Sequence, residues 1–164
     1  MNKRAGVPDG LFYMVAIFAV AIISVVGYMV LVNINTEFQS SSGISDQGKA
    51  LTEGIKDKYV GIIDNSFLII LVGILIGTVA GVWFIKTHPA LFWIMIPIFA
   101  FIIFMSMIYS NVYFNFAANS KIAPTEADFI IIPFIMNNYG KIITGVVILI
   151  ANNLFSKGRR QEAA

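Results

Sequence analysis

Acidic side chains and one histidine are the residues of this chain that could do chemistry. His88 is the only histidine, and there is no cysteine; a zinc site needs three or four ligands. Asp64, Glu126 and Asp128 could share a cation through their carboxylates. A simpler interpretation is that carboxylates cap helix starts, with Asp64-Asn65 capping the helix that follows them. No nucleophile elbow or His-Glu-x-x-His motif is present. We therefore expect a non-enzymatic protein with no metal or other cofactor.

Transport chemistry is also poorly supported, because few ionisable residues interrupt the apolar runs. Transporters and channels usually place polar or charged groups inside the membrane. Three of the four long apolar runs contain no charged residue, and the fourth contains only Lys141. Asparagines such as Asn111 and Asn152 stand near the ends of the runs. The pattern favours packing over transport.

The composition predicts an all-α, polytopic integral membrane protein with a single transmembrane domain. The chain is 58% hydrophobic and 12% charged, whereas soluble domains carry about 25% charged residues. A bilayer core needs about 20 apolar residues per helix. We predict four spans, at residues 11–34, 66–85, 90–113 and 139–155. The lipid bilayer is the expected partner, and a net charge of +2 gives no reason to expect nucleic acid.

The second and third spans are expected to form an antiparallel hairpin, because only Lys86-Thr87-His88-Pro89 separates them. The second span carries Gly73, Gly77 and Gly81 at four-residue spacing. Such a glycine zipper allows another helix backbone to approach closely. The partner could be another span of the same chain or a neighbouring subunit, and the pattern does not distinguish them.

Proline and aromatic residues mark further features of the spans. Pro97 lies inside the third span and predicts a kink. Trp83, Trp93 and Tyr113 lie near the predicted membrane faces, where aromatic side chains are favoured. We expect them to be interfacial anchors, together with Lys141.

An amphipathic helix is predicted in the outer loop at about 45–63, with Ser45 and Asp46 as its caps. Its apolar face could lie on the membrane interface or on a neighbouring subunit, unless the helix is merely solvated. The fourth apolar run is interrupted around Asn137-Asn138. We predict an interfacial or re-entrant piece at about 126–137, then a short span; one tilted helix over 129–155 is the alternative.

Charge distribution predicts the orientation of the chain. With four spans, both termini lie on one side of the membrane. That side holds six basic residues and the other holds five. The basic clusters at the termini adjoin the first and last spans. Because basic residues favour the cytoplasmic side, we expect both termini there, in a virion membrane or in a host or bacterial inner membrane.

Three short motifs in the middle third of the chain carry a resemblance: Asp64-Asn65-Ser66-Phe67, Thr87-His88-Pro89 and Ser110-Asn111-Val112-Tyr113. With the apolar spans between them, they resemble small polytopic membrane proteins of viruses that contain a lipid membrane. The resemblance implies a virion membrane component, present in many copies and held by helix and capsid contacts. It implies no catalytic residue.

Together these patterns predict a structural membrane protein that packs or oligomerises in a bilayer, alone or with other membrane or capsid subunits. A holin-like pore-forming or permeabilising protein is the main alternative, because small size and glycine-rich packing also fit it. An accessory subunit of a secretion or energy-coupling complex is a second alternative.

Overall fold

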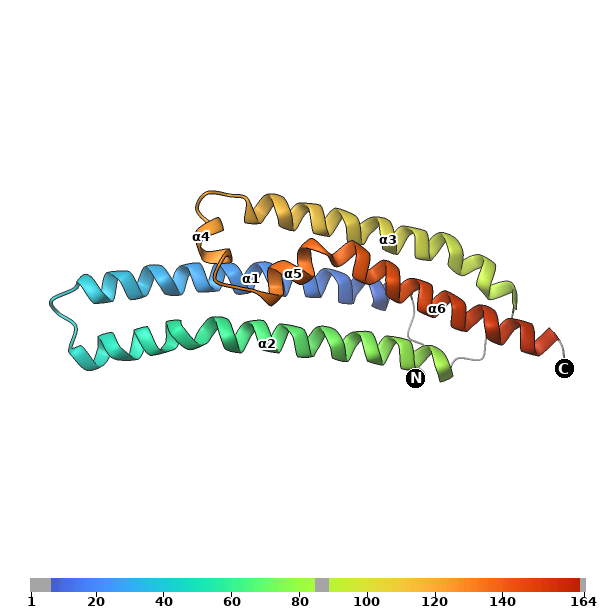
Figure 1. The fold of residues 1–164 in the computed structure, drawn as a ribbon, viewed down its shortest axis with the longest axis horizontal. Helices are drawn as coiled ribbons and strands as arrows, with labels where there is room; N and C mark the ends of the chain where they lie inside the picture. Colours follow the sequence, from blue (N-terminus) through green and yellow to red (C-terminus); the bar gives the residue numbers. More distant parts are fainter. Residues whose placement is uncertain (1–6, 85–88, 163–164) are drawn as a thin grey trace.

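The fold, taken from a computed structural model, consists of helices joined by short connections (Figure 1). The structure describes residues 7–84 and 89–162, and within these ranges it contains no strand. The four long helices are α1 (Val7–Ser40), α2 (Asp46–Phe84), α3 (Pro89–Ala117) and α6 (Tyr139–Glu162). Two short helices, α4 (Ala123–Glu126) and α5 (Ile131–Asn137), lie between α3 and α6 in the sequence.

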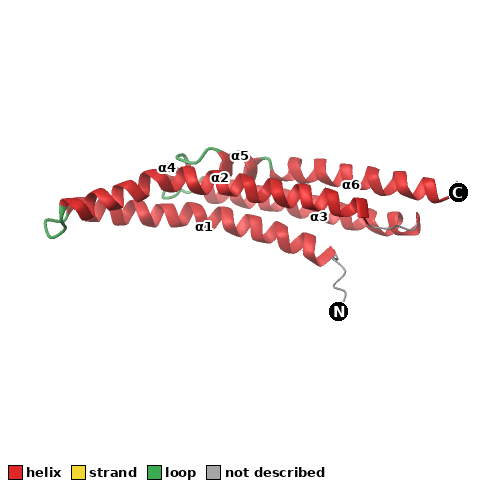
Figure 2. Cartoon of the chain, turned by 90° about the horizontal axis from the view of Figure 1, so that it is seen from below, coloured by secondary structure: helices red, strands yellow, loops and turns green. Residues whose placement is uncertain are grey.

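The four long helices confirm the predicted fold class. Each contains a segment long and apolar enough to cross a membrane. These segments are Phe12–Ser40, Asp46–Gly81, Trp93–Ala117 and Tyr139–Ser156. The helix axes run along the long dimension of the molecule, as two views at right angles show (Figures 1 and 2). The chain is therefore an α-helical protein of the integral membrane class.

The outer-loop helix and the second span are one continuous helix, and this differs from the sequence-based expectation. α2 runs for 39 residues without a break. Its start is capped as predicted, because the Gly48 N–H donates to Ser45 Oγ at 3.3 Å. The prediction that Asp64 and Asn65 cap a separate span is wrong. Those residues lie inside a helix, where the backbone N–H groups are already bonded to carbonyls one turn earlier.

α1 packs chiefly against α2, and the polar ends of the two helices project beyond the other elements (Figure 1). We call these ends, residues 35–40 and 46–58, the α1–α2 arm. Gln39 and Lys49 join the helices near the tip, with each side chain donating to the other residue's carbonyl at 3.0 Å. Further in, the rings of Tyr28 and Tyr59 stack at 5.6 Å. The arm therefore continues the bundle axis outward (Figure 1).

The predicted hairpin of the second and third spans is not shown. α2 packs chiefly against α1, and α3 packs chiefly against α6. The start of α6 approaches α3 closely, since a Cβ added at Gly140 would lie 3.0 Å from Met107 Cγ. Residues 85–88, which join the two predicted spans, lie outside the described residues.

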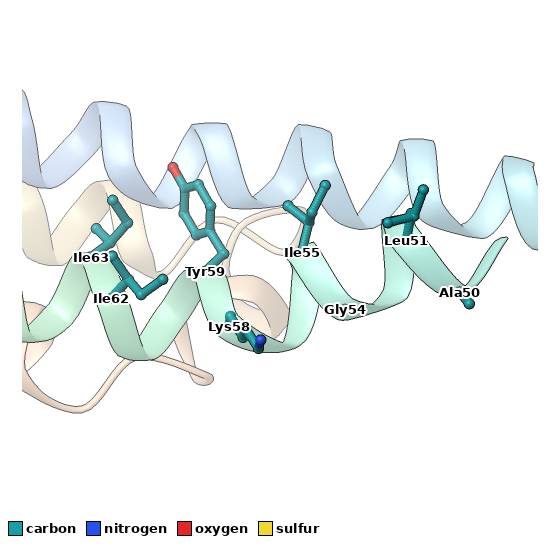
Figure 3. Close-up of a pocket in the computed structure, with 8 residues that line it drawn as sticks. All are labelled: Ala50, Leu51, Gly54, Ile55, Lys58, Tyr59, Ile62 and Ile63. Atoms are coloured by element: carbon teal, nitrogen blue, oxygen red, sulfur yellow. The ribbon is translucent and has the colours of Figure 1, made fainter. Parts of the chain in front are cut away.

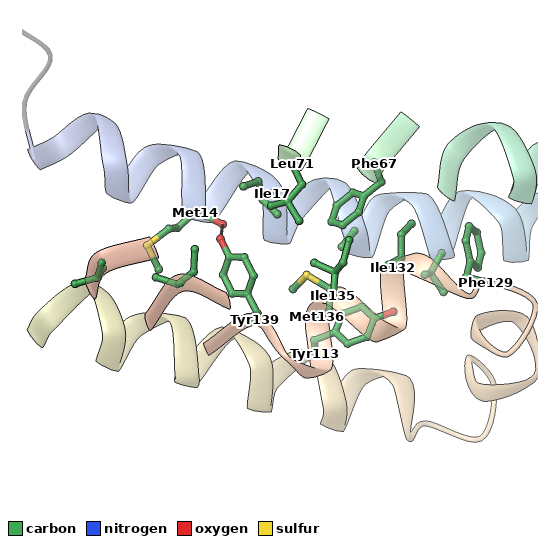
Figure 4. Close-up of a cluster of buried hydrophobic side chains, with 14 of the residues drawn as sticks. Met14, Ile17, Phe67, Leu71, Tyr113, Phe129, Ile132, Ile135, Met136 and Tyr139 are labelled. Atoms are coloured by element: carbon green, nitrogen blue, oxygen red, sulfur yellow. Dashed lines mark hydrogen bonds between the residues drawn. The ribbon is translucent and has the colours of Figure 1, made fainter. Parts of the chain in front are cut away.

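The fourth apolar run is divided at Asn138, and α6 begins at Tyr139, the position at which the sequence predicts the last span. The preceding piece, predicted to be interfacial or re-entrant, forms the short helix α5, which buries one face and leaves Phe134 exposed on the other. In α5, the side chains of Ile132, Ile135 and Met136 are buried. They pack into a core formed by all the long helices (Figure 4). Tyr139 Oη reaches across this core and donates to the Met14 carbonyl at 3.4 Å.

Candidate functional site

The side chain of Asp64 on α2 holds the start of α5 through three hydrogen bonds. The N–H groups of Ile130 and Ile131 donate to Oδ2 at 2.8 and 2.7 Å. The Ile132 N–H donates to Oδ1 at 2.7 Å. Asp64 is buried, so this carboxylate replaces its lost hydration with three backbone donors. The start of α5 has no side-chain cap of its own.

Two features of the sequence are consistent with this contact: the spacing of Asp64 from the apolar residues that follow it, and the lack of a capping residue at the start of α5. Asp64, Phe67 and Leu71 are all buried, and their spacing of three and four residues is one face of a helix. An acid on such a face needs donors inside the protein. The short run Ile130-Ile131-Ile132 begins a helix without serine, threonine, aspartate or asparagine at its N-cap, so its free N–H groups need an acceptor from elsewhere.

Glu126 lies close to this contact at the end of α4, outside the membrane-spanning helices. Tyr113 Oη donates to Glu126 Oε1 at 3.5 Å. Burial raises the pKa of Glu126 above its usual value, and the hydrogen bond from Tyr113 acts in the opposite direction without cancelling the effect. Among the described residues no cluster of three or more acidic, histidine or cysteine side chains could hold a metal ion. Asp64 acts here as a helix cap, with both oxygens engaged by backbone N–H groups.

The three glycines of the predicted zipper face away from the rest of the chain. A Cβ added to Gly73, Gly77 or Gly81 would meet no atom within 4 Å. The two possible partners left open by the sequence are therefore no longer equivalent. No other helix of the same chain covers this surface in the described residues, so it faces lipid or another molecule.

The remaining predicted residues lie in different surroundings. Tyr113, a predicted interfacial anchor, is completely buried, and its hydroxyl donates to Glu126. Trp93 is 73% exposed, as a lipid-facing anchor would be. Lys141 Nζ donates to Asn138 Oδ1 at 3.1 Å, one turn back toward α5. Pro97 is accommodated within the unbroken helix α3. Trp83 belongs to the last turn of α2, and its side chain lies outside the described residues.

Comparison with protein-family models, with curated proteins and with solved structures finds no match to this chain.

Removing the Asp64 carboxylate should destabilise the protein strongly. We expect Asp64→Ala to cost about 2–3 kcal/mol, because three N–H groups, that of Ile132 buried and the other two partly buried, lose their acceptor. Asp64→Asn should cost about 1 kcal/mol, since one oxygen remains to accept as a neutral cap. Unfolding in a mild detergent measures both. Asp57→Ala, an exposed acid on the same helix, is the matched control; an Asp64→Ala protein as stable as this control would contradict the capping role.

Neutralising Glu126 should stabilise the protein at neutral pH. Because the folded-state pKa is raised, the folded protein loses stability as the pH rises through that pKa. Glu126→Gln removes this loss and keeps an acceptor for Tyr113. We expect a small increase in Tm at pH 7 that disappears as the pH falls below 4.5, the ordinary pKa of a glutamate side chain. An increase that is the same at every pH would show that the charge of Glu126 is not its cause.

Proposed function

We propose that this protein is a non-enzymatic structural subunit that assembles with copies of itself, or with other membrane or capsid subunits, in a lipid bilayer. The observation that carries the proposal is the open glycine face of α2. Gly73, Gly77 and Gly81 lie within an apolar helix, yet none of them touches another helix in the part of the chain that the structure describes. In a bilayer, close van der Waals approach between helices is a principal source of association.

The distribution of charge supports a packing role. The apolar parts of α1, α2 and α3 contain no charged residue. Lys141, near the start of α6, extends its amine to Asn138 and back toward the short helices. A side chain in that position resembles a lysine that reaches toward the membrane surface. The buried hydroxyls of Ser24 on α1 and Ser106 on α3 donate to carbonyls of their own helices, which favours packing over a conduction path.

The localisation that goes with this proposal is a virion membrane, or a host or bacterial inner membrane, with both termini on the cytoplasmic side. The start of α1 and the end of α6 lie toward the same end of the molecule (Figures 1 and 2), which agrees with four crossings. The virion assignment rests on the resemblance within residues 64–116.

Reporter domains fused to either terminus should both be active only on the cytoplasmic side, because the basic clusters there favour retention. Purified membrane-containing virions should hold the protein in many copies. A reporter active only outside the cell would contradict the orientation, and virions lacking the protein would contradict the virion assignment.

Gly77→Leu should weaken assembly and leave the fold of the single chain intact. The new side chain enters open space within the chain and replaces glycine with a residue of higher helix propensity, by about 0.8–1 kcal/mol. Any lost association therefore comes from contact with another molecule. We expect at least a tenfold weaker association, about 1.4 kcal/mol, measured by light scattering in a mild detergent and by crosslinking in membranes.

The matched control is Gly145→Leu on α6, which is also exposed and also meets nothing within 4 Å. Equal oligomer size and stability in both variants would contradict the packing role of the Gly77 face. Expression in bacteria adds a second readout, because abrupt lysis or dye leakage would favour the holin-like alternative.

A further inference from the structure

A repeat of exposed isoleucines runs along α2. Ile55, Ile62, Ile69 and Ile76 follow one another at intervals of seven residues. They are 56%, 60%, 71% and 64% exposed, in that order. A seven-residue apolar repeat on a helix is the pattern by which one helix packs along another. A surface that faces only lipid must be apolar, but nothing requires its isoleucines to recur every seven residues.

The positions between the isoleucines complete the pattern. Four residues before each isoleucine lies another exposed residue of the same face: Leu51, Lys58, Asn65 and Val72. The last three of these also follow the preceding isoleucine by three residues. We call this face, from Leu51 to Ile76, the α2 stripe. Each residue advances about 100° around a helix, so steps of three and four keep the stripe on one side of α2.

Small residues border the stripe. Gly54 and Gly61 lie on one side of it, and Gly73 lies on the other. A Cβ at any of these glycines would meet nothing within 4 Å. Helices with small residues beside the contact line can approach closely. The borders of the stripe are therefore free of bulky side chains that would hold a second helix away.

A groove of about 420 Å³ lies on the outer half of the stripe (Figure 3). Its lining includes Leu51, Gly54, Ile55 and Lys58. Residues spaced three, one and three positions apart surround a single hollow on the surface of a helix. Ile55, Lys58, Tyr59 and Ile62 form a second set with the same spacing. In coiled coils, a side chain of one helix inserts into such a hole formed by four residues of the other.

The surroundings of the stripe limit what can cover it. Its outer half lies among charged residues of the α1–α2 arm, including Lys49, Glu53 and Asp57, where hydrocarbon cannot cover it. Its inner half lies in the apolar part of α2, where water cannot. A partner must therefore be a helix that follows the stripe out of the membrane on the same side, over about 37 Å in all, which is the rise of 25 residues.

We propose that α2 binds the α2 of a second copy of this chain, in parallel, along the α2 stripe. This inference rests on the proposed assembly in the membrane and adds to the glycine face a second surface on α2, with a stated partner. A second copy has a helix of the required length, orientation and repeat. α1 cannot serve, because it already packs beside the stripe, where Tyr59 donates to the Ser24 carbonyl at 3.4 Å. A two-fold axis along the membrane normal brings each residue of the stripe next to its equivalent.

Asn65 and Lys58 fix the register of this pair. Asn65 Nδ2 donates to the Gly61 carbonyl at 2.7 Å, and in the described part of the chain its Oδ1 accepts no hydrogen bond. An amide can donate and accept, so two Asn65 side chains are complementary across the axis, and polar pairs of this kind fix register. The apolar stem of Lys58 can cover the groove while its amine remains in water.

Cysteine crosslinking tests the proposal directly, since the natural chain contains no cysteine. Single substitutions are made in the full chain, and membranes are treated with an oxidant. Ile69→Cys should form disulfide-linked dimers several-fold more efficiently than Ile70→Cys. Ile70 is 53% exposed but lies about 100° away around the helix. In the outer half, Ile62→Cys should exceed Asp57→Cys by a similar factor.

Each outcome bears on the proposal. High yields at Ile55, Ile62, Ile69 and Ile76, with unchanged thermal stability of each variant, support it. Equal yields at Ile69 and Ile70, or maxima at Gly73, Gly77 and Gly81, overturn the stripe while the proposed assembly stands. Crosslinking confined to the membrane half also overturns it. A wild-type protein that is monomeric in membranes and in mild detergent overturns the inference and the proposed function together.

Discussion

The hydrogen bonds that Asp64 accepts from the start of α5 are the contact on which the arrangement of the other helices depends. A short helix with no cap of its own would leave free N–H groups inside the bundle, and a buried carboxylate alone would lack solvation. Each satisfies the other, at 2.7–2.8 Å. The contact joins residues 66 to 68 positions apart in the sequence, and it places α5 beside α2 and thereby sets where α6 begins.

The break before α6 follows from that anchor. With α5 held at Asp64, Ile132, Ile135 and Met136 point into the core, and Ser110 on α3 donates to the carbonyls of Met136 and Asn137 at 2.9 and 3.1 Å. Carbonyls at the end of a helix need such donors when water is excluded. α6 then starts afresh at Tyr139 and packs along α3, where Gly140 allows close contact with Met107.

The same arrangement leaves one long helix incompletely covered. α1 and the core take up the face of α2 that carries Tyr59, Asp64 and Phe67. The glycine face and the isoleucine repeat remain outside, and they continue from the apolar segment into the charged arm. The packing of the helices within the chain and the surface left for other molecules thus both follow from α2, because one side of this helix is covered and the other is not.

The sequence by itself determined the class of this protein, the number of apolar helices and the restart of the last one at Tyr139, because these depend on local composition and period. Only the tertiary structure decided that α2 is unbroken through Asp64, that Tyr113 is buried and that Gly77 is open. The sequence of a carboxylate residue followed by an apolar run is the same whether the carboxylate caps its own helix or a distant one. Likewise, glycine spacing indicates a contact but not its partner, and long-range packing supplies the answer in both cases.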